Sequence, residues 1–230
     1  MIVLEYCKLI RNFTMHRYYN IHTHHAASEM DCLSVRNISA DFHLSLADAP
    51  YSMGLHPWYL DHADDMYGLL QQQAIQSQVL AIGECGLDKV TGAAWDTQVH
   101  WFRQQIQLAN HLNKPLIIHC VRAFNEVLQV LKEEQVAVSV IFHGFHKKKQ
   151  LAAQILSQGY ILSFGAALLK GNAALIDVLQ WVPTDQFFLE TDDADISIKE
   201  LYHIAAQIRK TEEEAIILQL QRNFKNIFGV

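Results

Sequence analysis

Side chains that can bind metals stand at the ends of five aliphatic runs in this 230-residue chain. The clearest run, Val79 to Ile82, is followed by Glu84, which lies between Gly83 and Gly86. Four further runs end in the same way, at the following residues: His22 and His24, His119, His143, and Glu190 and Asp192. Imidazole nitrogens and carboxylate oxygens are ligands that zinc and similar divalent ions take in proteins. Their recurrence at strand ends predicts a metal centre.

Spacing and neighbouring residues assign roles to three of these side chains. His22 and His24 stand two residues apart, so a strand places both imidazoles on one face, as two ligands of one metal require. Glycines flank Glu84 on both sides, and backbone can approach closely at a glycine. We therefore expect the Glu84 carboxylate to bridge two ions.

His119, His143 and Asp192 are more convincing as metal ligands when they are considered together with the other candidates. His119 or His143, taken alone, is more often a buried structural histidine than a ligand. Together with the other residues they complete a nitrogen and oxygen ligand set. Asp192 either binds the metal or acts as the base that orients the attacking water. Glu190 precedes it by two residues, so both carboxylates are expected on one face of the last strand.

Alternating strand and helix patterns predict the elements that position these groups. Strands are expected at 18–24, 32–38, 51–56, 79–84, 115–120, 138–143, 160–165 and 187–191. Helices are expected at 61–77, 95–112, 122–134, 148–158, 171–181, 197–209 and 212–228. Eight strands with helical crossovers favour an α/β fold of the TIM-type (β/α)8-like class, in which the carboxyl ends of the strands share one rim. Residues 25–60 leave room for a strand but not for a strand–helix pair, so the barrel should be clipped or irregular between strands one and three.

Composition is typical of one compact domain, because 50% of the residues are hydrophobic and 18% are charged. We expect residues 1–17 to be an N-terminal extension and residues 18–230 to be a single hydrolase barrel. The apolar segment Met1–Phe13 contains Glu5 and Lys8 and makes a poor signal peptide. A cytoplasmic protein without membrane contact or an obligate protein partner is expected. The net charge of −6 excludes a broadly basic nucleic-acid binder.

Six short motifs occur along the chain in a fixed order: His22-Thr23-His24, Gly54-Leu55-His56-Pro57, Gly83-Glu84-Cys85-Gly86-Leu87-Asp88, Ile118-His119-Cys120, Phe142-His143-Gly144-Phe145 and Leu189-Glu190-Thr191-Asp192. In this order they resemble the TatD family of metal-dependent deoxyribonucleases and hydrolases. The C-terminal segment Asn223 to Gly229 resembles the ending of that family, so the match covers about residues 18–230.

The resemblance implies a site with one or two divalent ions, zinc, magnesium or manganese. Six residues are expected to hold them: His22, His24, Glu84, His119, His143 and Asp192. Hydrolysis of phosphodiester bonds by a metal-activated water is implied, with DNA or another phosphoester as substrate. Glu84 and Asp192 are the expected catalytic residues. No Gly-x-Ser-x-Gly motif supports a serine nucleophile, and strand alternation turns Cys85 and Cys120 away from the site.

Three departures from the family pattern concern the substrate. Asn20 stands where the family has Asp before its first histidine pair, and the arginine that the family has after the histidine of strand five is either missing or displaced by one position, to Arg122. The loop with an Arg-Asn pair that receives phosphate after Asp192 is missing. The run His146 to Lys149 on the loop after strand six can replace these contacts, although a lysine run is usually a solvated face.

Substrate contacts are therefore predicted for four residues: His56, Lys89, Arg122 and Lys147. Trp58, two residues after His56, is either a structural residue or a surface on which a base stacks. Two other functions remain open. The barrel could be a metal-dependent amidohydrolase or small-molecule phosphoesterase, although Glu84 occupies the place where amidohydrolases often carry a carboxylated lysine. A binding barrel without catalysis would be expected to lack a ligand, and none is missing from the sequence.

Overall fold

The computed structural model describes residues 17–26, 29, 31–39, 42 and 49–230. All of the predicted N-terminal extension except Arg17 therefore lies outside the described residues. The chain divides into two compact units. One comprises Met1–Ser34 together with Gly144–Val230, and the other comprises Val35–His143.

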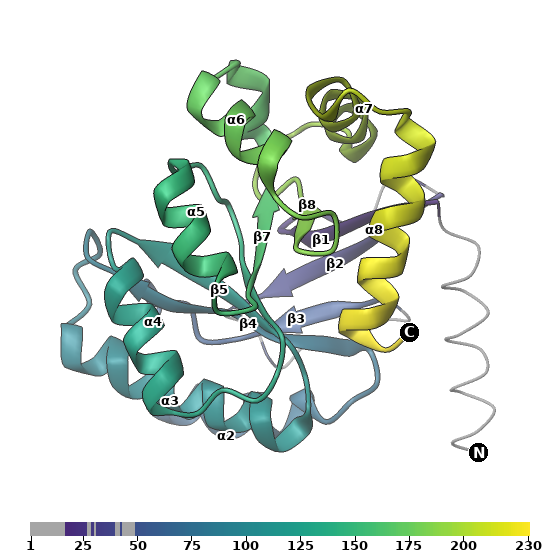
Figure 1. The fold of residues 1–230 in the computed structure, drawn as a ribbon. Coiled ribbons are helices and arrows are strands. Elements are labelled where there is room, and N and C mark those ends of the chain that lie inside the picture. Colours follow the sequence, from purple (N-terminus) through teal and green to yellow (C-terminus); the bar gives the residue numbers. More distant parts are fainter. Residues whose placement is uncertain (1–16, 27–28, 30, 40–41, 43–48) are drawn as a thin grey trace. The chain divides into compact units, whose positions relative to one another are not determined.

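Eight parallel strands follow one another in a single sheet, in the order β1 to β8 (Figure 1). Their bounds are β1 Tyr18–Thr23, β2 Cys32–Ile38, β3 Tyr51–Met53, β4 Val79–Asp88, β5 Leu116–Val121, β6 Val140–Phe142, β7 Ile161–Phe164 and β8 Phe187–Leu189. A parallel bridge between Thr23 and Asp192 links the end of β1 to the residues after β8. The strand order and the alternation with helices confirm the predicted α/β barrel class.

Helices follow the strands from β3 onward. Their bounds are α2 Ala63–Ala74, α3 Trp95–Leu112, α4 Phe124–Glu133, α5 Lys149–Leu156, α6 Ala173–Trp181, α7 Ile198–Arg209 and α8 Glu213–Phe228, with a 3-10 helix η1 at Ala166–Lys170. Within the described part of the chain, α2 is the first helix, so the described residues between β1 and β3 include strand β2 and no helix. None of the helices among the described residues combines the length and the apolar character needed to cross a membrane.

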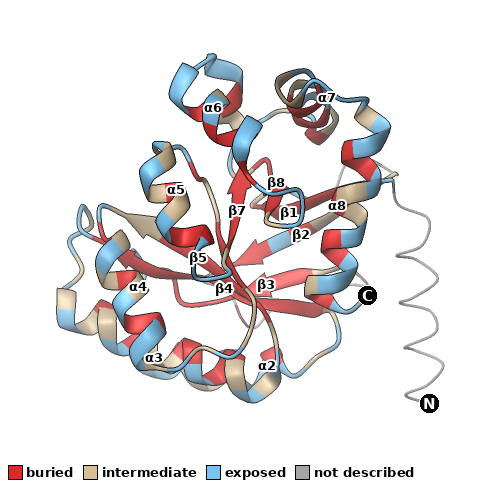
Figure 2. Cartoon of the chain, in the orientation of Figure 1, coloured by how far each residue is buried: buried red, intermediate tan, exposed pale blue. Residues whose placement is uncertain are grey.

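In the unit Val35–His143, helices α2, α3 and α4 pack against β4 and β5. The strands are buried, whereas the helices alternate buried and exposed residues (Figure 2). Helix α3 buries Phe102 and Ile106, which lie four residues apart on one helical face. Strand β5 contributes Leu116, Ile117 and Ile118, all fully buried. A strand buried on both faces reads as a continuous apolar run, which is why the sequence reveals it.

Strand β4 continues to Asp88, beyond the predicted end at Glu84. Its register against β5 shifts between Ile82 and Cys85, and Gly86 then pairs with His119. Gly86 has φ +144°, and a Cβ atom there would overlap the backbone carbonyl of His119. Glycine is therefore required at this position. It lets the end of β4 lie directly against the end of β5.

In the other unit, α7 and α8 pack on β1 and β8. Tyr19 of β1 stacks near Phe224 of α8, with ring centroids 4.6 Å apart. The hydroxyl of Tyr202 in α7 accepts a hydrogen bond from the Tyr19 backbone N–H at 3.0 Å and donates one to the Tyr19 carbonyl at 3.1 Å. Tyr202 is fully buried, and burial raises its pKa. This hydroxyl fixes the strand that carries His22 against its covering helix.

We predict that Tyr202→Phe lowers the free energy of unfolding by about 1–3 kcal/mol. The substitution removes two buried hydrogen bonds, while the backbone N–H and carbonyl of Tyr19 stay buried away from water. Chemical denaturation followed by circular dichroism measures the change. Tyr67→Phe is the matched control: the Tyr67 hydroxyl donates to the carbonyl of Gln104 at 2.9 Å in a half-exposed position. Its loss should be smaller, about 1 kcal/mol or less. Equal stability of Tyr202→Phe and the wild type would contradict this account.

Candidate metal centre

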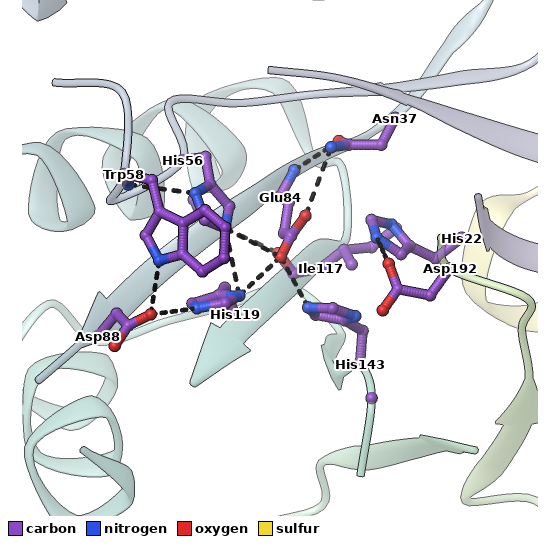
Figure 3. Close-up of polar contacts among 12 residues, drawn as sticks. His22, Asn37, His56, Trp58, Glu84, Asp88, Ile117, His119, His143 and Asp192 are labelled. Carbon is purple, nitrogen blue, oxygen red and sulfur yellow. Dashed lines mark hydrogen bonds and ion pairs between the residues drawn. The ribbon is translucent and has the colours of Figure 1, made fainter. Parts of the chain in front are cut away.

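Within the unit Val35–His143, three imidazoles surround one carboxylate oxygen (Figure 3). From Glu84 Oε1, the Nδ1 atom of His119 is 2.7 Å away, the Nε2 atom of His143 is 2.8 Å away and the Nε2 atom of His56 is 3.2 Å away. The Glu84 side chain is only 4% exposed. Strands β4 and β5 carry Glu84 and His119, while His143 follows β6. Neighbouring strands therefore bring together three of the predicted ligands, Glu84, His119 and His143, and the predicted substrate residue His56.

Asn37 of β2 holds the glutamate from the opposite side. Its Oδ1 atom accepts the Glu84 backbone N–H at 2.8 Å, and its Nδ2 atom lies 3.5 Å from Glu84 Oε2. The hydroxyl of Ser52 in β3 donates to Asn37 Oδ1 at 3.2 Å. Asn37 is not among the predicted site residues, although it too is a polar residue near the end of a strand.

Asp88, the last residue of β4, lies on the outer side of His119. It is 1% exposed, and its Oδ2 atom accepts the indole N–H of Trp58 at 2.6 Å and lies 3.1 Å from Nε2 of His119. Its Oδ1 atom accepts the backbone N–H of Val90 at 2.7 Å. Burial acts to raise the pKa of Asp88, but the hydrogen bonds from Trp58, Val90 and His119 outweigh it, and the pKa lies below its ordinary value. Asp88 belongs to one of the six motifs, but no role is predicted for it from the sequence.

His56 is buried at 6% exposure, against Glu84 and His119. Burial lowers its pKa, although the neighbouring Glu84 acts in the opposite direction. The exposed aromatic surface at this edge belongs instead to Trp58 and Tyr59, each 54% exposed. His56, which is predicted to contact substrate, lies inside the carboxylate cluster, and the neighbouring aromatic residues Trp58 and Tyr59 are exposed to solvent.

The other unit holds a second group of predicted ligands. The Oδ1 atom of Asp192 lies 3.5 Å from Nε2 of His22 and 3.4 Å from Nε2 of His24. Backbone bonds fix this arrangement, because the Asp192 N–H donates to the His22 carbonyl and the His24 N–H donates to the Asp192 carbonyl. Asp192 has φ +54°. The bridge that joins β8 to β1 therefore also places this carboxylate beside both histidines.

Glu190 and Asp192 have different partners. Strand β8 ends at Leu189, so the alternation of side chains along a strand does not extend to Asp192. Glu190 is fully buried and its Oε1 atom accepts the backbone N–H of Gly144. It anchors the segment that follows β6, whereas Asp192 faces the histidines of β1.

The donor atoms in each unit fit a divalent metal. His56, Glu84 and His119 each offer an atom within 4.8 Å of the others. His24, Asp192 and Asp193 do the same in the second group. Nitrogen and carboxylate donors at such spacing suit zinc and related ions, and those of the first group are also buried. Asp193 was not predicted, and the only signal in the sequence is its position next to Asp192.

The predicted cations differ in what they contact. Lys89 forms an ion pair with Glu126, and its Nζ atom lies 5.5 Å from the centroid of the Trp95 ring. Arg122 is exposed directly after β5 and has φ +54°. In the other unit, Lys147 contacts the ring of His146. Cys85 is fully buried and burial raises the pKa of its thiol, which excludes it as a nucleophile.

Two bacterial proteins are similar to this chain in sequence. A metal-dependent hydrolase of Buchnera aphidicola is 27% identical over 78% of this chain and 74% of its own length. The metal-dependent hydrolase YcfH of Escherichia coli is 33% identical over 62% of this chain and 54% of its own length.

Solved structures share the fold. The TatD homologue YjjV of Escherichia coli superposes with a TM-score of 0.82 at 21% identity, covering 94% of this chain and 99% of its own. A TatD family hydrolase of Entamoeba histolytica gives 0.76 at 15% identity, covering 93% and 98%. The family model described as TatD related DNase matches residues 23–229. With nearly the whole chain matched, this protein belongs to the TatD family, and its fold is the TIM-type barrel of the solved relatives.

Proposed function

We propose that this protein hydrolyses phosphodiester bonds with divalent metal ions, as a deoxyribonuclease of the TatD type. The observation that carries the proposal is the convergence of three imidazoles on the buried carboxylate of Glu84. Several such groups around one carboxylate have little structural purpose, because burying ionisable side chains is costly unless partners or a metal compensate. Family membership and relatives named as metal-dependent hydrolases support the same chemistry.

Each group of ligands is proposed to bind divalent ions, with one or two ions per chain. In parallel α/β barrels the carboxyl ends of all strands meet at one rim, where active sites are built. The six proposed ligands lie in the carboxyl-terminal halves of strands or in the residues that follow them: His22, His24, Glu84, His119, His143 and Asp192. Glu84 is the proposed bridge, and zinc, magnesium and manganese are the candidate ions.

When bound, a divalent ion lowers the pKa of water to about 7 and neutralises charge on phosphate oxygens. Asp192 is proposed to orient and deprotonate the attacking water, since 38% of its side chain reaches solvent beside His22 and His24. The Glu84 side chain has no such access to solvent, so its proposed role is to bridge the ions and not to pass a proton to bulk water. Attack by water needs no covalent enzyme intermediate.

DNA ends, single strands and generic phosphodiesters are the proposed substrates. After Asp192 the chain runs through Asp193 to Ile196 and enters α7 at Ile198, without the family's phosphate loop. Asn20 exchanges two hydrogen bonds with Thr191 and fixes this segment. The substrate contacts proposed are those of His56, Lys89, Arg122 and Lys147. Location in the cytoplasm and action without an obligate protein partner stay predictions.

We predict that His22→Ala/His24→Ala loses metal while its circular dichroism spectrum is retained, because both proposed nitrogen ligands of β1 are removed. Elemental analysis after loading with zinc or manganese measures the loss. His25→Ala is the matched control, since this neighbouring exposed histidine contacts the carbonyl of Asp193. The control should keep its metal. Equal metal content in the double variant and the control would refute the ligand assignment.

Asp192→Asn tests the proposed base. The substitution preserves shape and some coordinating power, so metal content should fall little, whereas kcat should fall by roughly 10²–10⁴. Steady-state kinetics on a phosphodiester and elemental analysis of the same sample give both values. If the variant instead loses metal and recovers activity in excess ion, Asp192 is primarily a ligand.

The lysine run can be tested with a control inside it. Lys149 lies 3.6 Å from Asp177 and 4.9 Å from the Trp181 ring centroid, so α6 already engages it. We predict that Lys147→Gln/Lys148→Gln weakens binding of single-stranded DNA and flattens its salt dependence by roughly 0.7 in log–log slope for each lost contact. Lys149→Gln should change the slope less. An unaltered slope in the double variant would make these lysines a solvated face.

A panel of DNA ends, internal duplex sites, small phosphoesters and amides separates the candidate reactions. The proposal predicts faster cleavage of single-stranded or terminal phosphodiesters than of internal duplex sites. Turnover of amides alone would instead support the amidohydrolase alternative.

A further inference from the structure

We propose that Trp58 and Asp88 are positioning residues that set which ring nitrogens of His56 and His119 carry protons. In this arrangement His119 turns a lone pair toward the metal, while His56 donates a hydrogen bond to Glu84 and is not a ligand. The inference rests on the proposed metal-dependent function. All the contacts that carry it lie within the unit Val35–His143.

Asp88 is held in a single orientation. The indole N–H of Trp58 donates to Oδ2 at 2.6 Å and the backbone N–H of Val90 donates to Oδ1 at 2.7 Å. The side chain of buried Gln98 bonds both the N–H and the carbonyl of Asp88, at 2.8 and 3.1 Å. With backbone and carboxylate both fixed, Oδ2 is a rigid acceptor pointed at His119.

This acceptor determines the proton on His119. The Nε2 atom lies 3.1 Å from Asp88 Oδ2, a hydrogen bond that requires the proton to be on Nε2. In the neutral ring Nδ1 then carries the lone pair, and Nδ1 is the atom that faces Glu84 Oε1 at 2.7 Å. A carboxylate that accepts the distal N–H of a histidine is the usual partner of a metal ligand. Two acceptors that face each other this closely suit coordination of a common cation.

The proton on His56 is set by the same tryptophan. The backbone N–H of Trp58 donates to Nδ1 of His56 at 3.1 Å, so the neutral ring carries its proton on Nε2. That nitrogen lies 3.2 Å from Glu84 Oε1 and 3.2 Å from Nδ1 of His119. His56 therefore offers a proton where His119 offers a lone pair. Two histidines on the same glutamate oxygen take opposite roles.

A role in packing alone does not explain Trp58. Its ring is 54% exposed, so it buries much less apolar surface than a core tryptophan would. Its two N–H groups, in contrast, both reach residues beside the cluster (Figure 3). The outer face of the ring remains available to solvent or substrate.

Asp88→Asn is the direct test. Oδ2 faces both Trp58 and His119, so the amide of asparagine either turns its N–H donors toward both of them or keeps its oxygen there and faces the Val90 N–H with a donor. Either orientation weakens the fixed acceptor for His119 Nε2, which favours the proton on Nδ1. We expect the affinity for Zn²⁺, measured by competition with a chelating dye, to fall about 10–100-fold. In the metal-free protein with ¹⁵N-labelled histidine, long-range ¹H–¹⁵N spectra at about pH 8 should show the His119 proton on Nε2 in the wild type and on Nδ1 in the variant.

Trp58→Phe is the second variant, with Trp95→Phe as the matched control. Phenylalanine at position 58 removes the indole donor to Asp88 but retains the backbone N–H to His56. Zinc affinity should therefore fall in the lower part of the same range, about 10-fold, and the His56 proton should stay on Nε2. Trp95 lies over Lys89 in the same unit, and its replacement should leave both the affinity and the two tautomers unchanged.

Two results would overturn the positioning role. One is a His119 that is doubly protonated, or protonated on Nδ1, in the metal-free wild type. The other is zinc affinity in Asp88→Asn within about twofold of the wild type, which is far less than the loss of such a partner causes. A wild type that binds no zinc would refute the proposed function instead, and the tautomers of the metal-free protein would still decide the positioning role.

Discussion

The burial of the Glu84 carboxylate is the constraint on which the cluster around it depends. A carboxylate that is 4% exposed loses most of its hydration, and a loss of this kind costs several kcal/mol unless other groups replace it. Asn37 donates to Oε2 on one side, and three imidazoles lie within 3.2 Å of Oε1 on the other. These groups come from β2, from the residues after β3, from β5 and from the end of β6, so the charge on β4 holds several elements at one point.

The backbone of β4 makes this convergence possible. Gly86 allows the strand to lie against the carbonyl of His119, where any side chain would collide. Continuing the strand to Asp88 then places a second carboxylate on the far side of the same imidazole. The His119 ring thus lies between the carboxylates of Glu84 and Asp88, which have different proposed roles. Glu84 faces the proposed ions, and Asp88 fixes the ring.

In the unit that comprises Met1–Ser34 and Gly144–Val230, strand pairing positions the proposed ligands. The backbone of Asp192, which follows β8, is hydrogen-bonded to the backbone of His22 and His24 at the end of β1. These bonds place the Asp192 carboxylate beside both histidines. Tyr202 holds β1 from the helix side, and Asn20 holds Thr191. The ligands in this unit are positioned mainly by backbone bonds, whereas those around Glu84 are positioned mainly by side chains. A backbone-held carboxylate with partial exposure is suited to handle water.

The sequence by itself determined the eight strands, the helices from 61 onward and the residues at the strand ends, because periodicity and burial follow from local residue order. It could not determine the proton positions on His56 and His119, nor the roles of Asn37, Asp88 and Trp58. These depend on atoms that meet from different strands, at distances that only the folded chain sets. The same reason separates Lys149, engaged by α6, from its neighbours. Residue type at a strand end is local information, whereas the partner of a side chain is decided by tertiary packing.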